Sequence, residues 1–207
     1  HSHADIQITT YITMTTKDIK EIIGDYNIFL RILLRHLRES GINVDSLVSD
    51  HLCYRVSSQE IYQTKKSEFL SNNHTLLAET MVNGRLICTF KLSQPLVYHD
   101  TVTGTTRTIE LVELPSPKPN RPQLDGLEHT EFVIDEDFQK FIERHRDVMR
   151  GQWVLQALNK ELNADVETEF EPSHLMAERR TFSAKFHHQT LEKVIEIEKA
   201  MELEQHN

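Results

Sequence analysis

The chain has 207 residues, of which 38% are hydrophobic and 27% are charged, and this length suits one compact domain or two small modules that share a core. Its formal net charge of -9 argues against a nucleic-acid binder that neutralises phosphates and against adhesion to an anionic membrane surface. Any site for an anionic small molecule must therefore be a local pocket.

The sequence favours a soluble, cytoplasmic protein. No apolar run approaches the roughly 18 residues that a membrane-spanning helix requires, and the N-terminus lacks the pattern of a secretory signal. The two cysteines, Cys53 and Cys88, lie inside strand-like runs, which favours free thiols in a reducing compartment over a disulfide framework. The sequence predicts no particular oligomeric state.

Residues 1–45 are predicted to form a helical cover over the rest of the chain. Apolar side chains recur at helical spacing across residues 17–40, with Lys and Arg opposite, and Gly24 and Gly41 are natural breaks. A basic amphipathic helix could bind a partner or a membrane, but we favour packing on the chain's own core.

Residues 46–116 are predicted to form a first βαβββ module. Residues 50–56 alternate, as in a strand, between an apolar side and a side that carries His51 and Arg55. The Asn83-Gly84 pair is a strong signal for a tight hairpin between two later strands. The remaining elements are expected at residues 58–69 (helix), 76–82, 86–92 and 109–114 (strands).

Residues 117–126 are rich in proline and are predicted to be an extended linker, because proline cannot donate a hydrogen bond inside a sheet. Residues 127–207 are predicted to form a second βαβββ-like module with a C-terminal helix, in one integrated α+β domain. Its elements are expected at residues 127–134 (strand), 137–149 (helix), 181–188 (strand) and from Thr190 onward (helix), while residues 152–168 do not distinguish helix from strand.

A repeated spacing suggests a metal site between the modules. His51 and His129 are 78 residues apart, and Glu113 and His187 are 74 residues apart, so the first and last strands of each module carry a side chain that can bind a metal. Three imidazoles and one carboxylate suit a divalent Zn, Mn, Fe, Ni or Co ion. The alternative is coincidence, since the chain has 12 histidines. We interpret six of them as surface residues: His36, His74, His99, His145, His174 and His206.

Other side chains on the same strand faces suggest a substrate site. Glu131 shares a face with His129, and it is our candidate general base, although it could instead ligate the metal or orient His129. Glu79 is a second candidate base. Arg55, Lys91 and Lys185 could bind the carboxylate or phosphate of a small anionic ligand, with Arg85 as a further candidate; the alternative is that these cations only balance buried acids.

Five runs of sequence carry a resemblance to a known family: SDHLCYRV, LLAETMVNGRLICTFKLSQPLVY, IELVELPSP, GLEHTEFVI and KFHHQTLEKVIEIEKA. They resemble the YecM family, a branch of the vicinal-oxygen-chelate superfamily that includes glyoxalase I and the extradiol dioxygenases. The resemblance implies two βαβββ modules that form curved sheets around a central cup, with a divalent metal in the cup. It also implies ligands on the first and fourth strands, at His51, Glu113, His129 and His187, although many superfamily members have a carboxylate where His187 stands.

The resemblance implies Lewis-acid chemistry on a substrate with two neighbouring oxygens. Three hypotheses follow. The first is a metal-dependent isomerase or lyase that acts on a small oxygenated acid. The second is a non-haem iron dioxygenase, and the third is a non-catalytic module that binds a metal or a small ligand.

Overall fold

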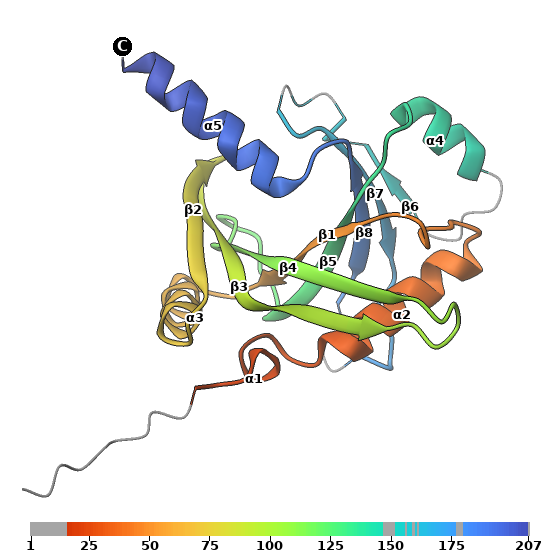
Figure 1. The fold of residues 1–207 in the computed structure, drawn as a ribbon, viewed down its shortest axis with the longest axis horizontal. Coiled ribbons are helices and arrows are strands. Elements are labelled where there is room, and N and C mark those ends of the chain that lie inside the picture. The colour runs from red at the N-terminus through yellow and green to blue at the C-terminus, as the bar shows by residue number, and fades with distance from the viewer. Residues whose placement is uncertain are drawn as a thin grey trace, which may run out of the picture.

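The computed structural model describes residues 16–146, 152–155, 157–158, 160, 162–176 and 180–206. In this part of the chain, five helices surround one eight-stranded sheet (Figure 1). The elements are α1 (Ile19–Ile23), α2 (Tyr26–Glu39), β1 (Ser49–Arg55), α3 (Gln59–Ser71), β2 (Thr75–Val82), β3 (Arg85–His99), β4 (Thr106–Pro115), β5 (Gly126–Val133), α4 (Phe138–His145), β6 (Gln152–Val154), β7 (Asp165–Phe170), β8 (Phe182–His187) and α5 (Leu191–Gln205).

The sheet is built from two similar halves. Its strand order is β2-β3-β4-β1-β5-β8-β7-β6, with β1 parallel to β4, β5 parallel to β8, and β1 antiparallel to β5 at the centre. Each half runs strand, helix and three strands, so the predicted α+β class with two βαβββ modules is confirmed. The sheet curves strongly around a cup (Figure 1).

The correspondence between the halves differs from the one that the sequence spacing suggested. With His51 matched to His129, the pairing of each first strand with its fourth strand makes Lys185 the counterpart of Glu113. His187, which the spacing had matched to Glu113, lies two residues farther along β8. Residues two apart in a strand share a face, so Lys185 and His187 both lie on the cup side.

Helices cover the face of the sheet that is opposite the cup. α2 begins at Tyr26 and is capped by Asp25, whose side chain accepts hydrogen bonds from two backbone amides, after Gly24 (φ 85°) separates it from α1. His36 of α2 contacts the ring of Phe182, and Phe141 of α4 packs on Phe186. The alternate residues of β8 therefore belong to the core, and the residues between them are free to face the cup.

Two predictions made from local pattern were wrong. β3 was expected to end near residue 92 but continues to His99, because a register shift between Lys91 and Leu96 leaves Pro95 outside the regular pairing. His74 and His145 were expected at the surface but are 8% and 2% exposed. The helix predicted at residues 137–149 corresponds to α4, which ends at His145. Residues 147–149 of the predicted range lie outside the described part of the chain.

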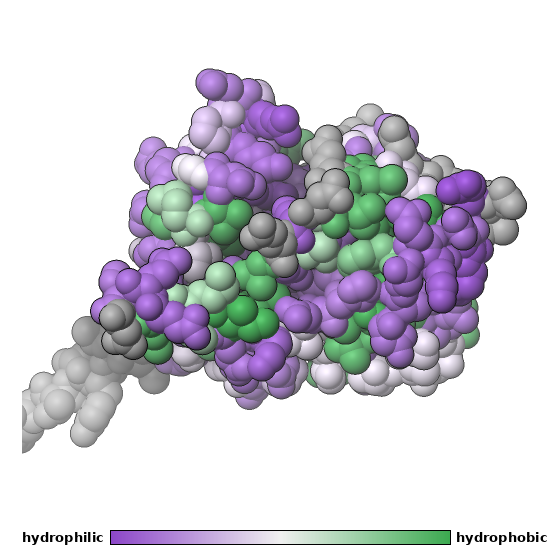
Figure 2. Space-filling view, turned by 90° about the horizontal axis from the view of Figure 1, so that it is seen from above, coloured by the Kyte–Doolittle hydropathy of each residue, from purple (hydrophilic) through white to green (hydrophobic). Residues whose placement is uncertain are grey.

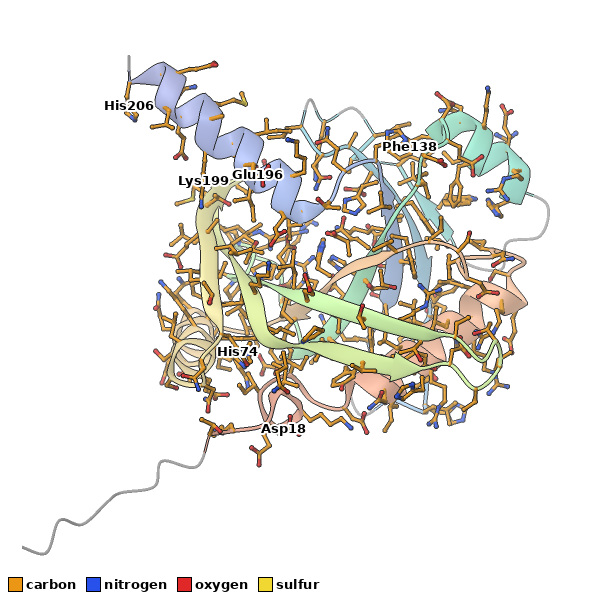
Figure 3. All side chains as sticks on the ribbon, in the orientation of Figure 1. Asp18, His74, Phe138, Glu196, Lys199 and His206 are labelled. Carbon is orange, nitrogen blue, oxygen red and sulfur yellow. The ribbon has the colours of Figure 1, made fainter. Side chains whose placement is uncertain are left out.

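Helix α5 covers one side of the cup. It leaves the end of β8 and crosses towards β2 (Figure 1), where Lys199, labelled in Figure 3, donates a hydrogen bond to the carbonyl of Leu77. Leu191 and Ile195 in its first turns pack on Leu111 of β4. The helix therefore connects the second half of the chain to the first.

The surface is mostly polar on the side that carries α5. Figure 2 shows hydrophilic residues over much of this face, with smaller groups of apolar residues between them. Among the described helices, none is long and apolar enough to cross a lipid bilayer.

Candidate metal centre

Three neighbouring strands bring four metal-competent side chains together. They are His51 of β1, Glu113 of β4, and His129 and Glu131 of β5, and one donor atom from each lies within 4.8 Å of the others. Three of the four are buried and Glu113 is half-buried. All four side chains project from the cup face of adjacent strands, so the backbone fixes their separation.

The carboxylate of Glu131 lies between the two imidazoles. His51 and Glu131 are paired residues of β1 and β5, and His51 Nε2 lies 2.5 Å from Glu131 Oε2. His129 Nε2 lies 3.7 Å from the same oxygen. The sequence left three roles open for Glu131, and a carboxylate in this position could ligate an ion or orient the imidazoles.

Each imidazole is oriented by the carboxylate of the residue before it. His51 Nδ1 donates to Asp50 Oδ2 over 2.7 Å, and His129 Nδ1 donates to Glu128 Oε1 over 3.1 Å. These bonds direct Nε2 of each ring towards the group of four. Both Nε2 atoms are buried and face the Glu131 carboxylate, at 2.5 Å from His51 and 3.7 Å from His129.

Two β-bulges explain how Asp50 and Glu128 can each bond to the histidine that follows it in the sequence. In the β1–β5 ladder, Asp50 is an extra residue in β1, and Glu128 is an extra residue in β5. A bulge breaks the strict alternation of side chains and re-aims the extra residue. The same arrangement of acid, histidine and bulge therefore occurs in both halves.

Without an ion, the charges of the group stabilise one another. Burial opposes a charge on His51, but the Glu131 and Asp50 carboxylates raise its pKa to about 10. Burial also opposes a charge on Glu131, but mainly the His51 charge holds the pKa of Glu131 well below its usual range. A metal ion would compete with the proton on His51 for the same site.

His187 lies beside the group of four. Its Nδ1 is 3.1 Å from Asn163 Oδ1 and 3.5 Å from Glu131 Oε1, and its ring centroid is 6.1 Å from that of His51. Its Nε2 is buried, without a hydrogen bond to any described residue. That His187 ligates a metal remains a prediction.

Lys185 takes the place in the second half that Glu113 takes in the first. Burial opposes its charge, but Glu131 and then Asp165 and Glu167 raise the pKa of Lys185 above its usual value. The side chain is therefore a cation beside the metal-competent group, and Glu131, Asp165 and Glu167 stabilise its charge.

The cup has a volume of about 680 Å³ and is lined by more cations than the sequence suggested. Arg55 and Lys185 line it as predicted, and so does Arg85. Lys91 does not line the cup, because its Nζ is held 3.0 Å from Glu192 on α5. The cup also contains cations and one buried acid that the sequence did not single out: Lys118, Arg121, Lys160 and Asp165.

Glu79, the second candidate base, lies outside the cup. It accepts a hydrogen bond from Tyr62 over 2.6 Å and pairs with Lys66 over 3.0 Å. These contacts join α3 to β2, so Glu79 is a structural partner there.

The fold and the site together define a protein of two βαβββ halves with a histidine and glutamate group at the centre of its cup. Comparison with known families places it further. The YecM family, described as "YecM protein", matches residues 18–198. The chain belongs to the YecM family, as its sequence had indicated.

Individual relatives agree with this assignment. Protein YecM of Escherichia coli is 32% identical over 58% of this chain and 60% of its own length, and an uncharacterized protein of Haemophilus influenzae is 26% identical over 59% and 61%. The matched segments thus cover about three fifths of these relatives. A solved structural-genomics structure, Protein EC4020, shares the fold with a TM-score of 0.63 and 23% identity, over 90% of this chain and 99% of the other.

Proposed function

We propose that the chain binds one divalent metal ion and acts on a small oxygenated acid, as an isomerase or lyase of the vicinal-oxygen-chelate type. The observation that carries this proposal is the convergence of two imidazoles and two carboxylates within 4.8 Å. This donor set suits Zn, Mn, Fe, Ni or Co. The imidazole nitrogens that face Glu131 are buried, and coordination to an ion would replace their contacts with this carboxylate.

When bound, the ion would act as a Lewis acid towards two neighbouring substrate oxygens. The protein's own residues do the remaining work. Asp50 and Glu128 hold the imidazoles in one orientation, residues of α5 line one side of the cup, and Lys185 attracts the acid group of the substrate. Glu131 completes the ligand set in this scheme, or else accepts a proton from the substrate.

A non-catalytic binding module is the alternative that one observation favours. If Glu131 ligates together with His51, Glu113 and His129, four protein donors leave fewer positions for a substrate than three would. The iron dioxygenase hypothesis has no such observation in its favour, and it requires Fe(II).

Binding of Mn(II) to chelator-treated protein tests both the site and its open positions. We expect stoichiometric binding with enhanced relaxation of water protons, which reports exchangeable water on the ion. Bound Mn(II) without this enhancement would favour the binding module, and no stoichiometric binding would contradict the proposal. Loss of Mn(II) in a Glu131→Gln variant that remains folded by circular dichroism would identify Glu131 as a ligand, whereas retention would show that Glu131 does not ligate. Glu79→Gln, outside the cup, is the matched control.

A further inference from the structure

We infer that the cup contains a second anion site, which binds a phosphate group through Arg55 of β1, Arg85 of β3 and Lys118 of the crossing between the halves. This inference deepens the proposed function and rests on it: the ligand would present oxygens to the four metal-competent side chains and a phosphate to this basic wall. Its substrate class is therefore a phosphorylated small molecule with neighbouring oxygens at its other end.

Arg55 provides a buried donor that lacks a partner. The residue is 6% exposed and lines the cup. Its Nε donates to Glu128 Oε1 over 2.8 Å, but its Nη1 is buried without a hydrogen bond to any described residue. A guanidinium N–H group without a partner can donate to an oxygen of a phosphate or a carboxylate.

Arg85 and Lys118 add charges that pair with no carboxylate in the described part of the chain. Arg85 Nη1 donates to the carbonyl of Ser116 over 3.3 Å, which is a neutral acceptor. Lys118 is half-buried in the cup wall, and the described residues offer it no ion pair. All four cations Arg55, Arg85, Lys118 and Lys185 line the same cup, and burial, followed by the charges of the other three, lowers the pKa of Lys118.

The carboxylates near this wall are already engaged. Glu128 is shared by Arg55 at 2.8 Å, Arg180 at 3.1 Å and His129 at 3.1 Å. Glu113 is the other acid whose charge reaches Arg55 and Arg85, and the proposed function uses it for the metal. Positive charge is therefore in excess at the wall, which favours a phosphate dianion over a single carboxylate.

The test is a calorimetric titration of inorganic phosphate into chelator-treated protein, where no ion can bind phosphate in place of the wall. Wild type should bind phosphate saturably. Arg85→Leu and Lys118→Met should each weaken the affinity about tenfold, the loss expected for one charge-assisted hydrogen bond. Lys160→Met, which removes a cup cation from the second half of the chain, is the control and should leave the affinity within about twofold.

Two results would overturn the inference: no saturable phosphate binding by wild type, or equal affinity in wild type and Lys118→Met. Lys118 lies in a loop and makes no ion pair with a described residue, so its variant should fold even if Arg85→Leu does not. Saturable phosphate binding by a wild-type protein that fails to bind Mn(II) when the ion is added back would contradict the proposed function alone. Loss of phosphate binding with the metal retained would contradict the anion site alone.

Discussion

His51 Nε2 and Glu131 Oε2 lie 2.5 Å apart across the central strands, which places a histidine of the first half against a carboxylate of the second. Lys185 is a further cation that interacts with this carboxylate. On the cup side, the contact between the two halves is therefore electrostatic.

Glu131→Gln should destabilise the metal-free protein strongly. Removing one member of a buried charge group leaves the others uncompensated, and we expect a loss of about 3 to 5 kcal/mol in the free energy of unfolding at pH 7. Urea unfolding of chelator-treated protein measures it. The double variant Glu131→Gln/Lys185→Met should recover part of the stability that Glu131→Gln loses. If the effects of the two substitutions on the free energy of unfolding are strictly additive, Glu131 and Lys185 do not interact.

Asp50 should influence both the metal and α5. Its Oδ2 accepts hydrogen bonds from His51 Nδ1 over 2.7 Å and from the backbone amide of Leu191 over 2.9 Å. Asp50→Ala should lower metal affinity about 10- to 100-fold, as is typical when the partner of a metal-bound histidine is lost. It should also speed hydrogen exchange at the start of α5.

A matched control for Asp50 is Asp25, which caps α2. Asp25→Ala should cost about 1 kcal/mol of stability and leave metal affinity unchanged. If Asp25→Ala and Asp50→Ala weaken metal binding equally, the effect at Asp50 is a general loss of stability and not an effect on His51.

The free energy of unfolding should decrease at acidic pH because of His145, a buried histidine outside the group of four metal-competent residues. Burial lowers the pKa of His145 from its usual 6.5, and its Nδ1 donates to the carbonyl of Phe141. The unfolded chain then binds the proton more readily, so this contribution to stability is present above pH 6.5 and is lost as the pH falls towards the lowered pKa.

The comparison that checks this contribution is urea unfolding of wild type and His145→Gln at pH 7 and pH 5. We expect the variant to lose less stability than wild type over this interval. His74 has a pKa lowered by burial in the same way, so some pH dependence should remain in the variant. An unchanged pH dependence in His145→Gln would show that His145 does not contribute, and His99→Gln, at an exposed position, is the control.

The crossing between the halves should affect the metal more than the fold. It runs from the end of β4, which carries Glu113, to the start of β5, which carries His129, and Pro119 lines the cup. Replacing Pro117 and Pro119 with glycine frees the backbone, so we expect weaker metal affinity with a small change in unfolding temperature. Equal affinity in the variant would show that the crossing only connects the halves.

Strand alternation was sufficient to place His51 on the polar face of its strand and Glu131 on the face of His129, because a period of two decides which face a side chain occupies. Glu113 and His129 share their faces with apolar residues, so the repeated spacing and the family resemblance were needed to select them. The same period cannot detect a slip of two residues, since such a slip leaves every side chain on its face. The match of Glu113 to His187 in place of Lys185 is a slip of this kind.

Other parts of the site had no periodic signal. Lys118 comes from a proline-rich crossing, where no repeat indicates the direction of a side chain. The bulges at Asp50 and Glu128 each depend on one extra residue in a ladder, which becomes visible only when both strands are aligned. For Lys91, the pattern gave the face of the strand but not the distance from the centre of the cup, and Glu192 holds the side chain outside it.

Metal content by mass spectrometry is the most direct test of the central claim. After purification without chelators, the wild-type protein should contain one divalent ion per chain. The control variant His99→Ala should contain the same amount, because His99 is exposed and lies outside the group of four metal-competent residues. His51→Ala should lose most of it, with its circular dichroism spectrum unchanged. Wild type without stoichiometric metal, or His51→Ala with the full amount, would contradict the proposal that these strands form a metal centre.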